Sequence, residues 1–323
     1  MRIVMMGTGP FAVPSFRRLL ESSHEVCALV TRPVPEAPPG RRVTVPPNPM
    51  REVAEAVGLP IVAPPSINSA DAVAQLRAWN ADLFMVCDYG QILSNEALAC
   101  SRLGGINLHA SLLPKYRGAA PINWAIHAGE FETGVTVIHM TPRLDAGPCL
   151  VQRATPIGLQ EDAGQLERRL SEFGAEAVME SLGMLEAWDG SSPLGEIQDP
   201  SRATRAPRLK KSDGEVDWQQ SAEQIARQVR AFQPWPGTYT HWQRTSAPLR
   251  LVLWRVEAEP QASGCPLPGT VMSVDDQSLR VACGSGMLRI TELQPSGKNR
   301  LPAAQFLRGY PLQVGDRLGV VAD

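Results

Sequence analysis

Short, mostly apolar segments alternate with helical patterns along the N-terminal half of the chain. The segments "RIVMM" at 2–6 and "EVCALV" at 25–30 are two of them, and a predicted helix follows each. Strands that are apolar throughout and separated by helices are typical of a parallel sheet covered on both faces. The alternation therefore predicts an α/β domain built on a doubly wound, mostly parallel, Rossmann-like sheet.

The same alternation continues to about residue 190. Further strands are predicted at 59–63, 82–90, 104–110, 134–140 and 148–154, and further helices at 49–58, 68–80, 120–129 and 161–188. From about residue 249 the segments become short, with glycine turns between them, which is typical of a small antiparallel β-barrel. A chain of 323 residues has room for two domains. We place residues 1–206 in the α/β domain and residues 207–323 in a C-terminal, OB-like β-barrel domain.

The composition is that of an ordinary globular protein. Apolar residues make up 43% of the chain and charged residues 20%, and no apolar run reaches the roughly 18–20 residues that a spanning helix needs. The N-terminus lacks the long apolar stretch of a secretory signal. We therefore expect a cytoplasmic protein that does not bind membranes.

Cysteine spacing and net charge exclude further classes. The six cysteines form no C-x-x-C pair and have no patterned histidines beside them, so neither a disulfide framework nor a zinc site is predicted. The net charge of −2 gives no overall positive field. Any contact with nucleic acid would depend on local basic clusters.

Residues 104–126, "GGINLHASLLPKYRGAAPINWAI", contain two polar side chains that are hard to bury in an apolar strand. Asn107 and His109 are two residues apart and point to the same face, while Ile106 and Leu108 pack on the other. Open α/β sheets bind ligands at the carboxyl ends of their parallel strands. A lone histidine on an apolar strand is usually a satisfied core residue, but the pairing with asparagine favours a binding crevice.

Charged residues follow this strand at two places. Lys115 and Arg117 lie in the rigid turn "SLLPKYRG", where they suit a charged ligand. Asp145 follows a later strand and is placed to approach His109 in a doubly wound fold, although an aspartate before Ala-Gly is equally typical of a turn. His139 follows the apolar Val137 and Ile138 in a strand-like run, and we interpret it as structural.

The stretch 105–149 resembles the active-site region of the folate-dependent formyltransferases. The matching motifs are Asn-x-His, Ser-Leu-Leu-Pro and a downstream Leu-Asp-x-Gly. The likeness extends to "MGTGPFAVPSF", "ADLFMVCDYGQILS", "RLKKSDGEVDWQQSAEQIARQVRAFQPWPGTYT" and "LQPSGKNRLPAAQFLRGYPLQVGDRL", so that it covers nearly the whole chain. Within the family, this full-length pattern is most similar to the members that act on tRNA.

Three sites differ from the pattern that family members usually show. The opening loop at 7–10 is Gly-Thr-Gly-Pro, where Gly-Thr-Pro and an acidic residue are usual. Asp88 stands where an alanine usually precedes Tyr-Gly, and Gln233 replaces the usual asparagine before Pro-Trp-Pro. None of these sites belongs to the Asn-x-His or Leu-Asp-x-Gly motifs.

The resemblance implies transfer of a formyl group from N10 of 10-formyltetrahydrofolate to the α-amino group of methionine on initiator tRNA. Attack of the amine places negative charge on the formyl oxygen, which donors already in place must stabilise. By resemblance, Asn107 and a protonated His109 are these donors, and Asp145 orients the imidazole and assists proton transfer. 10-Formyltetrahydrofolate is the formyl donor, and no metal is expected.

The resemblance also implies the binding residues. Folate is expected at Tyr89, Gly90, Gln91, Ile92, Leu93, Ser111, Leu112, Leu113, Pro114, Met140, Arg143 and Leu144. The acceptor and its tRNA are expected at Gly9, Pro10, Phe11, Arg41, Arg42, Lys115, Arg117, Gly118, Arg208, Lys210 and Lys211. A run of charge is usually a solvated surface, but two basic clusters in a chain without a basic excess favour phosphate binding. We expect a monomer.

Three other functions are compatible with parts of the sequence. The loop at 7–12 satisfies G-x-G-x-x-A and would suit an NADP-dependent oxidoreductase, although Thr31 and Arg32 stand where an acidic residue would bind the ribose. A formyltransferase acting on a sugar-nucleotide amine would share Asn107, His109 and Asp145. A catalytically inactive RNA-binding protein on the same scaffold is the third alternative.

Overall fold

The computed structural model describes residues 1–34, 48–244, 247–260 and 266–319. The chain divides into two compact units, which are described separately. The first comprises Met1–Pro121, Glu132–Pro156 and Leu166–Pro207, and the second Ile122–Phe131, Ile157–Gln165 and Arg208–Asp323. The domain boundary between residues 206 and 207 stays a prediction, since a compact unit is a geometric grouping and not a test of independent folding.

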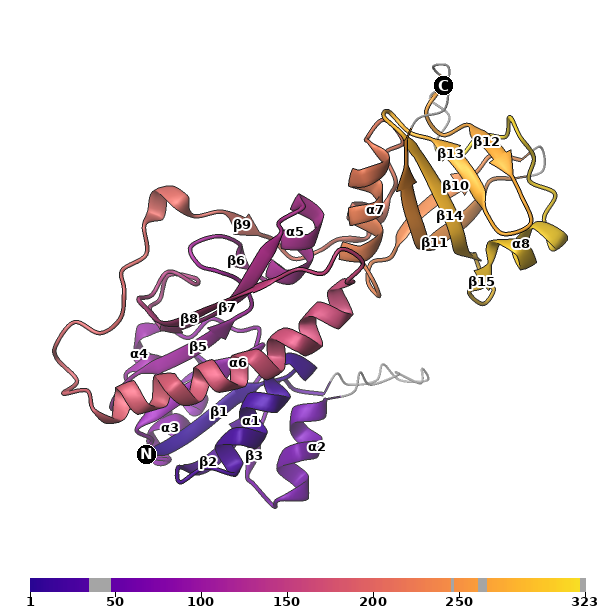
Figure 1. Cartoon of the computed structure of the whole chain (residues 1–323). Helices are drawn as coiled ribbons and strands as arrows, with labels where there is room; N and C mark the ends of the chain where they lie inside the picture. Colours follow the sequence, from indigo (N-terminus) through magenta and orange to yellow (C-terminus); the bar gives the residue numbers. More distant parts are fainter. Residues whose placement is uncertain (35–47, 245–246, 261–265, 320–323) are drawn as a thin grey trace. The chain divides into compact units, whose positions relative to one another are not determined.

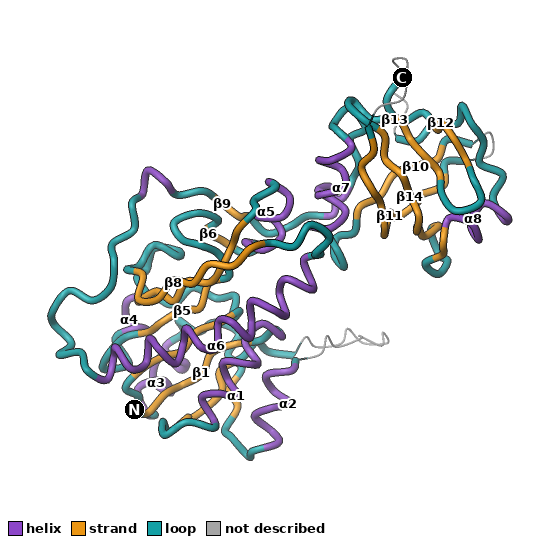
Figure 2. The backbone as a smooth tube through the Cα atoms, in the orientation of Figure 1, coloured by secondary structure: helices purple, strands orange, loops and turns teal. Residues whose placement is uncertain are grey.

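A seven-stranded sheet forms the centre of the first unit (Figures 1 and 2). Its strands, in spatial order, are β3 (Ile61–Val62), β2 (Glu25–Val30), β1 (Arg2–Gly7), β4 (Leu83–Cys87), β5 (Gly105–His109), β7 (Glu132–His139) and β8 (Cys149–Pro156). The strands from β3 to β5 pair in parallel, whereas β7 is antiparallel to both β5 and β8. The predicted doubly wound, mostly parallel α/β fold is confirmed.

Helices and short turns connect these strands. The helices of this unit are α1 (Val13–Leu20), α2 (Pro49–Ala56), α3 (Ala70–Ala78), α4 (Asn95–Leu98) and α6 (Ala163–Glu186), with 3-10 turns η1 (Pro10–Ala12) and η2 (Pro200–Arg202). Asn48, Ser69 and Ser94 cap α2, α3 and α4 by accepting a backbone hydrogen bond in the first turn. A separate two-stranded sheet pairs β6 (Arg117–Gly118) with β9 (Arg205–Ala206).

The register of the large sheet decides which way the polar pair of β5 points. Val86 of β4 packs in a buried cluster with side chains of α3 and α4. Val86 is paired with Asn107 in parallel register, so Asn107 shares that face of the sheet. Leu108 points to the opposite face, where a Cβ added to Gly174 of α6 would lie 2.7 Å from it. Helix α6 therefore packs closely on the apolar face of β5.

The second unit contains an antiparallel β-barrel. Its sheet has the order β10 (Thr238–Trp242), β11 (Leu249–Glu259), β14 (Met287–Pro295), β13 (Leu279–Ala282) and β12 (Val271–Val274), with β15 (Leu301–Pro302) paired to β14. The segment at Arg317 and Leu318 bridges to Thr270, next to β12, and to Trp242 of β10, and so closes the sheet on itself. The unit also holds α7 (Ala222–Ala231), α8 (Ala303–Gly309), η3 (Lys211–Gly214) and nearly all of α5 (Pro121–Ala128).

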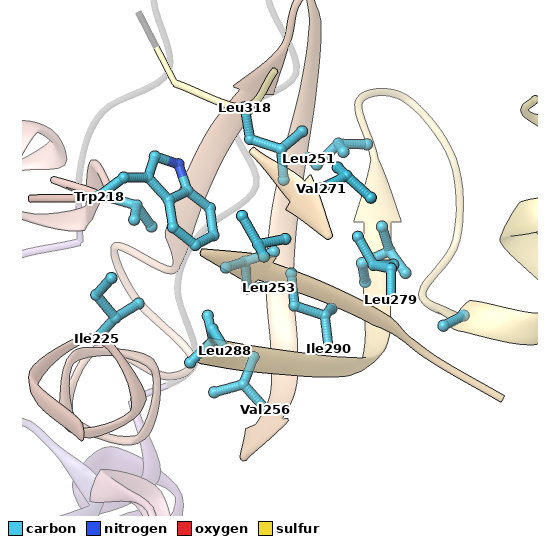
Figure 3. Close-up of a cluster of buried hydrophobic side chains, with 14 of the residues drawn as sticks. Trp218, Ile225, Leu251, Leu253, Val256, Val271, Leu279, Leu288, Ile290 and Leu318 are labelled. Atoms are coloured by element: carbon cyan, nitrogen blue, oxygen red, sulfur yellow. The ribbon is translucent and has the colours of Figure 1, made fainter. Parts of the chain in front are cut away.

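Buried hydrocarbon fills this barrel (Figure 3). Leu253 of β11 and Ile290 of β14 are fully buried in it, and Ile225 of α7 covers one side. The Trp218 ring packs in the same cluster, and its Nε1 donates to Oγ1 of Thr240 at 3.0 Å. Helix α7 is thus part of the barrel core.

The described cysteines are free thiols: Cys27, Cys87, Cys100, Cys149 and Cys283, whereas Cys265 lies outside the described residues. Burial raises the pKa of Cys149 to about 11 and that of Cys283 to about 12, so both stay protonated at neutral pH. In the part of the chain that the structure describes, every helix is too short or too polar to cross a bilayer.

Candidate active site

Strand β5 brings Asn107 and His109 to the carboxyl end of the parallel part of the sheet. Asn107 is partly buried, and His109 is 5% exposed. Among the described residues, the Asn107 amide makes no hydrogen bond. A ligand that accepts a hydrogen bond from this amide would therefore displace none of the described residues.

The His109 ring lies between a backbone carbonyl and a carboxylate. Its Nε2 is 2.9 Å from the carbonyl oxygen of Tyr116, and Nε2 carries a proton in this contact because a carbonyl only accepts. Its Nδ1 is 3.7 Å from Oδ2 of Asp145, which is longer than a hydrogen bond. The side chains of His109 and Asp145 are only 6% and 10% exposed. The structure thus places the predicted histidine and aspartate side by side.

Hydrogen bonds hold Asp145 in this position. Its backbone has a φ of 49°, in the left-handed region that aspartate tolerates better than most residues. Its Oδ2 accepts a hydrogen bond from the backbone N–H of Gly118 at 2.9 Å. The Nε2 of Gln198 donates to the carbonyl oxygens of Asp145 and Gly147, at 2.9 and 2.7 Å. Both the carboxylate and its loop are therefore fixed.

The turn after His109 is anchored to β7 and β8. The Ser111 hydroxyl donates to the Lys115 carbonyl oxygen at 2.7 Å. The Thr136 hydroxyl donates to the Ser111 carbonyl at 2.7 Å and accepts from the Leu113 N–H at 3.1 Å. Gln152 donates to the Leu113 carbonyl oxygen at 2.9 Å. Because Ser111 and Leu113 are buried, these two predicted folate residues stabilise the turn from inside.

Arg117 is also held by protein groups. Its Nε and Nη2 donate to Oε1 of Gln198 at 3.1 and 2.6 Å, and its backbone N–H donates to the Thr204 carbonyl oxygen at 2.9 Å. Arg117 therefore positions Gln198, which in turn holds the Asp145 loop. Lys115, in the same turn, is exposed.

The loop after β4 presents backbone and a few side chains. Tyr89 and Leu93 are buried in the core, and the Tyr89 carbonyl oxygen accepts from Nε of Arg32 at 2.9 Å. The Gln91 side chain accepts from the Ile67 N–H at 2.8 Å, whereas Ile92 is exposed. The other predicted folate residues that are exposed or partly exposed are Gly90, Leu112, Pro114, Met140, Arg143 and Leu144.

A surface pocket of about 380 Å³ lies beside the segment 140–144. Met140 lines it, together with Leu98 and Gly104. His139 and Trp188 also line this pocket and pack edge to face, with ring centroids 5.4 Å apart. The Nε2 of His139 lies 2.8 Å from a carbonyl oxygen, that of Leu103, which agrees with a structural role. The described residues contain no group of three or more His, Cys, Asp or Glu side chains that would hold a metal.

The residues predicted for the acceptor and tRNA differ in their exposure to solvent. Arg41 and Arg42 lie outside the described residues. The exposed members of the set are Pro10, Lys115, Arg208, Lys210 and Lys211, the partly buried ones are Gly9, Arg117 and Gly118, and Phe11 is buried.

Two side chains that support this site were not predicted. Thr136 is a polar residue between the apolar Val135 and Val137, which is the same signal that identified Asn107, and it is paired with His109 across β5 and β7. Gln198 lies in a polar stretch more than fifty residues beyond Asp145, and no local pattern distinguishes it. Its hydrogen bonds join segments that are far apart in the sequence, so they become visible only in the folded chain.

Comparisons with known proteins agree along the whole chain. The family model "Formyl transferase" matches residues 1–182, and "Formyl transferase, C-terminal domain" matches residues 208–311. The chain is 47% identical to a methionyl-tRNA formyltransferase of Rhodopirellula baltica over 98% of this chain and 96% of that protein. It is 45% identical to one of Geobacter metallireducens over 98% of each.

A solved structure of WlaRD, a sugar 3N-formyl transferase, has the same fold. It superimposes with a TM-score of 0.64 at 17% identity, over 93% of this chain and 99% of that one. At this identity the likeness concerns the fold alone. The two family models and the relatives that match end to end lead to one conclusion: the chain belongs to the formyl transferase family.

Proposed function

We propose that the protein transfers the formyl group of 10-formyltetrahydrofolate to the α-amino group of methionyl initiator tRNA. The observation that carries this proposal is the end-to-end identity of 45–47% with proteins named methionyl-tRNA formyltransferase. Both parts of the chain take part in that match, which covers 98% of the chain. The convergence of His109 and Asp145 beside Asn107 supports the chemistry.

The proposed mechanism uses three side chains. The neutral acceptor nitrogen attacks the formyl carbon, the carbon–N10 bond breaks, and the proton that the acceptor nitrogen loses passes to N10, which leaves as an amine. The Asn107 amide donates a hydrogen bond to the formyl oxygen as it gains negative charge. The Nε2–H of His109 donates the second one by exchanging the Tyr116 carbonyl oxygen for the formyl oxygen. Asp145 orients the ring and assists removal of the proton. The 3.7 Å separation of Nδ1 and Oδ2 would shorten when substrate is bound, as catalytic hydrogen bonds commonly do.

For the donor, we propose that the pterin binds between the backbone of residues 89–93 and the segment 140–144. The exposed backbone of Gly90 and the pocket beside Met140 support this placement. Main-chain N–H and C=O groups suit the edge of a pterin, which carries both donors and acceptors. We propose no metal in the reaction.

For the acceptor, we propose that tRNA phosphates bind the exposed basic cluster of Arg208, Lys210 and Lys211. Phosphate contacts from lysine and arginine supply most of the affinity of proteins for nucleic acid. Arg41 and Arg42 stay predictions for the acceptor end. The monomeric state and the cytoplasmic location stay predictions as well.

A direct assay tests this function. Purified protein is mixed with 10-formyltetrahydrofolate and with charged initiator or elongator methionyl-tRNA, and formyl transfer is measured. We expect formylation of the initiator species with a clear preference over the elongator. A nucleotide-linked amino sugar serves as the competing acceptor, and its preferential formylation would replace tRNA by a sugar substrate. NADPH binding measured by fluorescence tests the oxidoreductase alternative.

A further inference from the structure

Gly9 and Asp88 lie next to each other, and both are positions at which the sequence differs from the pattern that it otherwise resembles. A Cβ placed on Gly9, in the opening loop, would lie 1.7 Å from Oδ2 of Asp88, which follows β4. The backbone itself does not require glycine at position 9, because its φ of −89° is open to any residue. A side chain at position 9 would therefore have to displace the Asp88 carboxylate.

The backbone holds Asp88 against this loop. The N–H of Thr8 donates to the Asp88 carbonyl oxygen at 3.1 Å. Asp88 has a φ of 48°, a conformation open to aspartate and asparagine but costly for most side chains. Gly7 and Cys87 are paired in neighbouring parallel strands, so the two loops leave the same edge of the sheet side by side.

The Asp88 carboxylate has no hydrogen bond or ion pair among the described residues. Burial raises the pKa of Asp88, and Arg32 lowers it, although the side chain still reaches water. Burial and the Asp88 charge together raise the pKa of Glu167 on α6. Neither carboxylate has a hydrogen bond or ion pair with the described residues, and the Nε of Arg32 is used by Tyr89. A cationic group of a substrate would therefore be stabilised here.

The register places Asp88 next to the candidate catalytic residues. Val86 of β4 is paired with Asn107 of β5, so Asp88 follows β4 at the level where His109 ends β5. Neighbouring strands are about 4.8 Å apart. Asp88 thus stands one strand away from Asn107 and His109, at the sheet edge where open α/β sheets bind ligands.

We propose that Asp88 is a specificity-determining residue for the acceptor, and that its carboxylate, seated over Gly9, binds the ammonium form of the acceptor amine beside Asn107 and His109. This inference rests on the proposed function. An α-amino group is largely protonated near neutral pH, and a carboxylate forms a charge-assisted hydrogen bond with it. Asp88 supplies a carboxylate over the opening loop.

The first test removes the charge and keeps the shape. In Asp88→Asn the side chain has the same size and tolerates the same φ, so the fold is retained. We expect the KM for charged initiator tRNA to rise roughly tenfold or more, since a charge-assisted hydrogen bond is removed, with the KM for 10-formyltetrahydrofolate unchanged. Asp71→Asn is the matched control, because Asp71 is an exposed aspartate in the first turn of α3 and lies outside the proposed site, and it should leave the acceptor KM unchanged. An unchanged acceptor KM in Asp88→Asn, or an equal rise in the control, would overturn the inference.

The second test uses the close approach of Gly9 and Asp88. Gly9→Ala should displace the carboxylate and raise the acceptor KM as Asp88→Asn does. In an Asp88→Ala background the same Gly9→Ala change should add about twofold or less, because the clash has gone. Independent effects of the two substitutions would reject the proposal. A wild type that formylates no methionyl-tRNA would overturn the proposed function and this inference together, whereas an active wild type with unaffected variants would overturn this inference alone.

Discussion

Asn107 and His109 differ in how much the protein itself uses their donors. The His109 ring contacts the Tyr116 carbonyl and faces Asp145, whereas the Asn107 amide has no hydrogen bond within the described residues. Removing Asn107 should therefore affect the reaction and leave the fold intact. A donor that acts only on a developing oxyanion contributes to kcat more than to KM.

We expect Asn107→Ala to lower kcat by about 100-fold or more, since removing one oxyanion donor costs about 3–4 kcal/mol of barrier. The thermal unfolding temperature should stay within a few degrees of wild type. Asn299→Ala is the control, because Asn299 is an exposed asparagine outside the predicted site residues; its kcat should be near that of wild type. A folded Asn107→Ala variant with a wild-type kcat would remove Asn107 from the mechanism.

At the residue scale, local patterns identified polar side chains that break an apolar strand, and they did not identify the groups that hold them. Asn107 and His109 were singled out because they share one face of β5, and the register places that face on the same side of the sheet as Val86. Gln198 was missed because its hydrogen bonds to Asp145 and Gly147 join segments about fifty residues apart. The inward position of Ser111 depends on Thr136 of another strand in the same way.

The Asp88→Asn substitution should have opposite effects on stability and on activity. Its pKa is raised in the folded state, mainly by burial, so folding disfavours the ionised carboxyl. This cost is absent below the unfolded pKa of Asp and is fully present once the pH exceeds the raised folded value. Asp88→Asn should therefore have a higher free energy of unfolding than wild type at pH 7, and the difference should shrink as the pH falls. Urea unfolding at several pH values measures it, and a less stable variant at pH 7 would contradict the assignment.

At the element scale, most segments with an apolar pattern were predicted, including the two-residue β3 inside the strand expected at 59–63, whereas α7, β6 and β9 were not. The strands β1, β2, β4, β5 and β14 and the helix α6 lie where their apolar patterns place them. Helix α7 was not predicted as a helix, although Ser221 and Gln224 form a capping box and Ile225 and Val229 lie four residues apart. The two-residue strands β6 and β9 exist only through pairing with each other, so no local pattern predicts them.

Helices α5 and α7 meet at a ring stack whose charge state should depend on pH. The His127 ring stacks on Phe232, with centroids 5.2 Å apart, and Trp124 packs edge to face on both. Burial lowers the pKa of His127, and the nearby Arg227 lowers it further. The folded state therefore favours the neutral ring. The associated stability is present above the unfolded pKa and is lost as the pH falls below about 6.5.

Replacing this histidine should remove part of that pH dependence. We expect the free energy of unfolding of His127→Phe to fall less than that of wild type between pH 7 and pH 5, because the stacked ring is kept and no proton is taken up. His241→Phe is the control, since His241 lies on the partly exposed face of β10. Equal pH dependence in wild type and His127→Phe would contradict the role of this ring.

At the scale of the whole molecule, the change from an α/β pattern to short strands correctly predicted an α/β part followed by an antiparallel β-barrel part. The pattern did not predict that α5 and residues 157–165 belong to the second compact unit. The reason is that Asn123 donates to the Ala231 carbonyl and Arg230 to the Glu161 carbonyl, which joins segments about seventy or more residues apart. It also did not predict barrel closure by Arg317 and Leu318, which pair with strands about 50 to 75 residues earlier.

The exposed basic cluster at 208–211 leads to a prediction for the whole complex with tRNA. Its three cations are Arg208, Lys210 and Lys211, in a chain whose net charge is −2. Each phosphate that the protein no longer neutralises should reduce the slope of log K against log salt by about 0.7–0.9. Replacing all three cations by alanine should therefore weaken binding at low salt and flatten the slope by about 2, with kcat at saturating tRNA unchanged. Arg17→Ala with Arg18→Ala is the control, since these exposed arginines of α1 are outside the predicted set. If the control flattens the slope as much as the triple variant, the effect is that of overall charge and the cluster has no specific role.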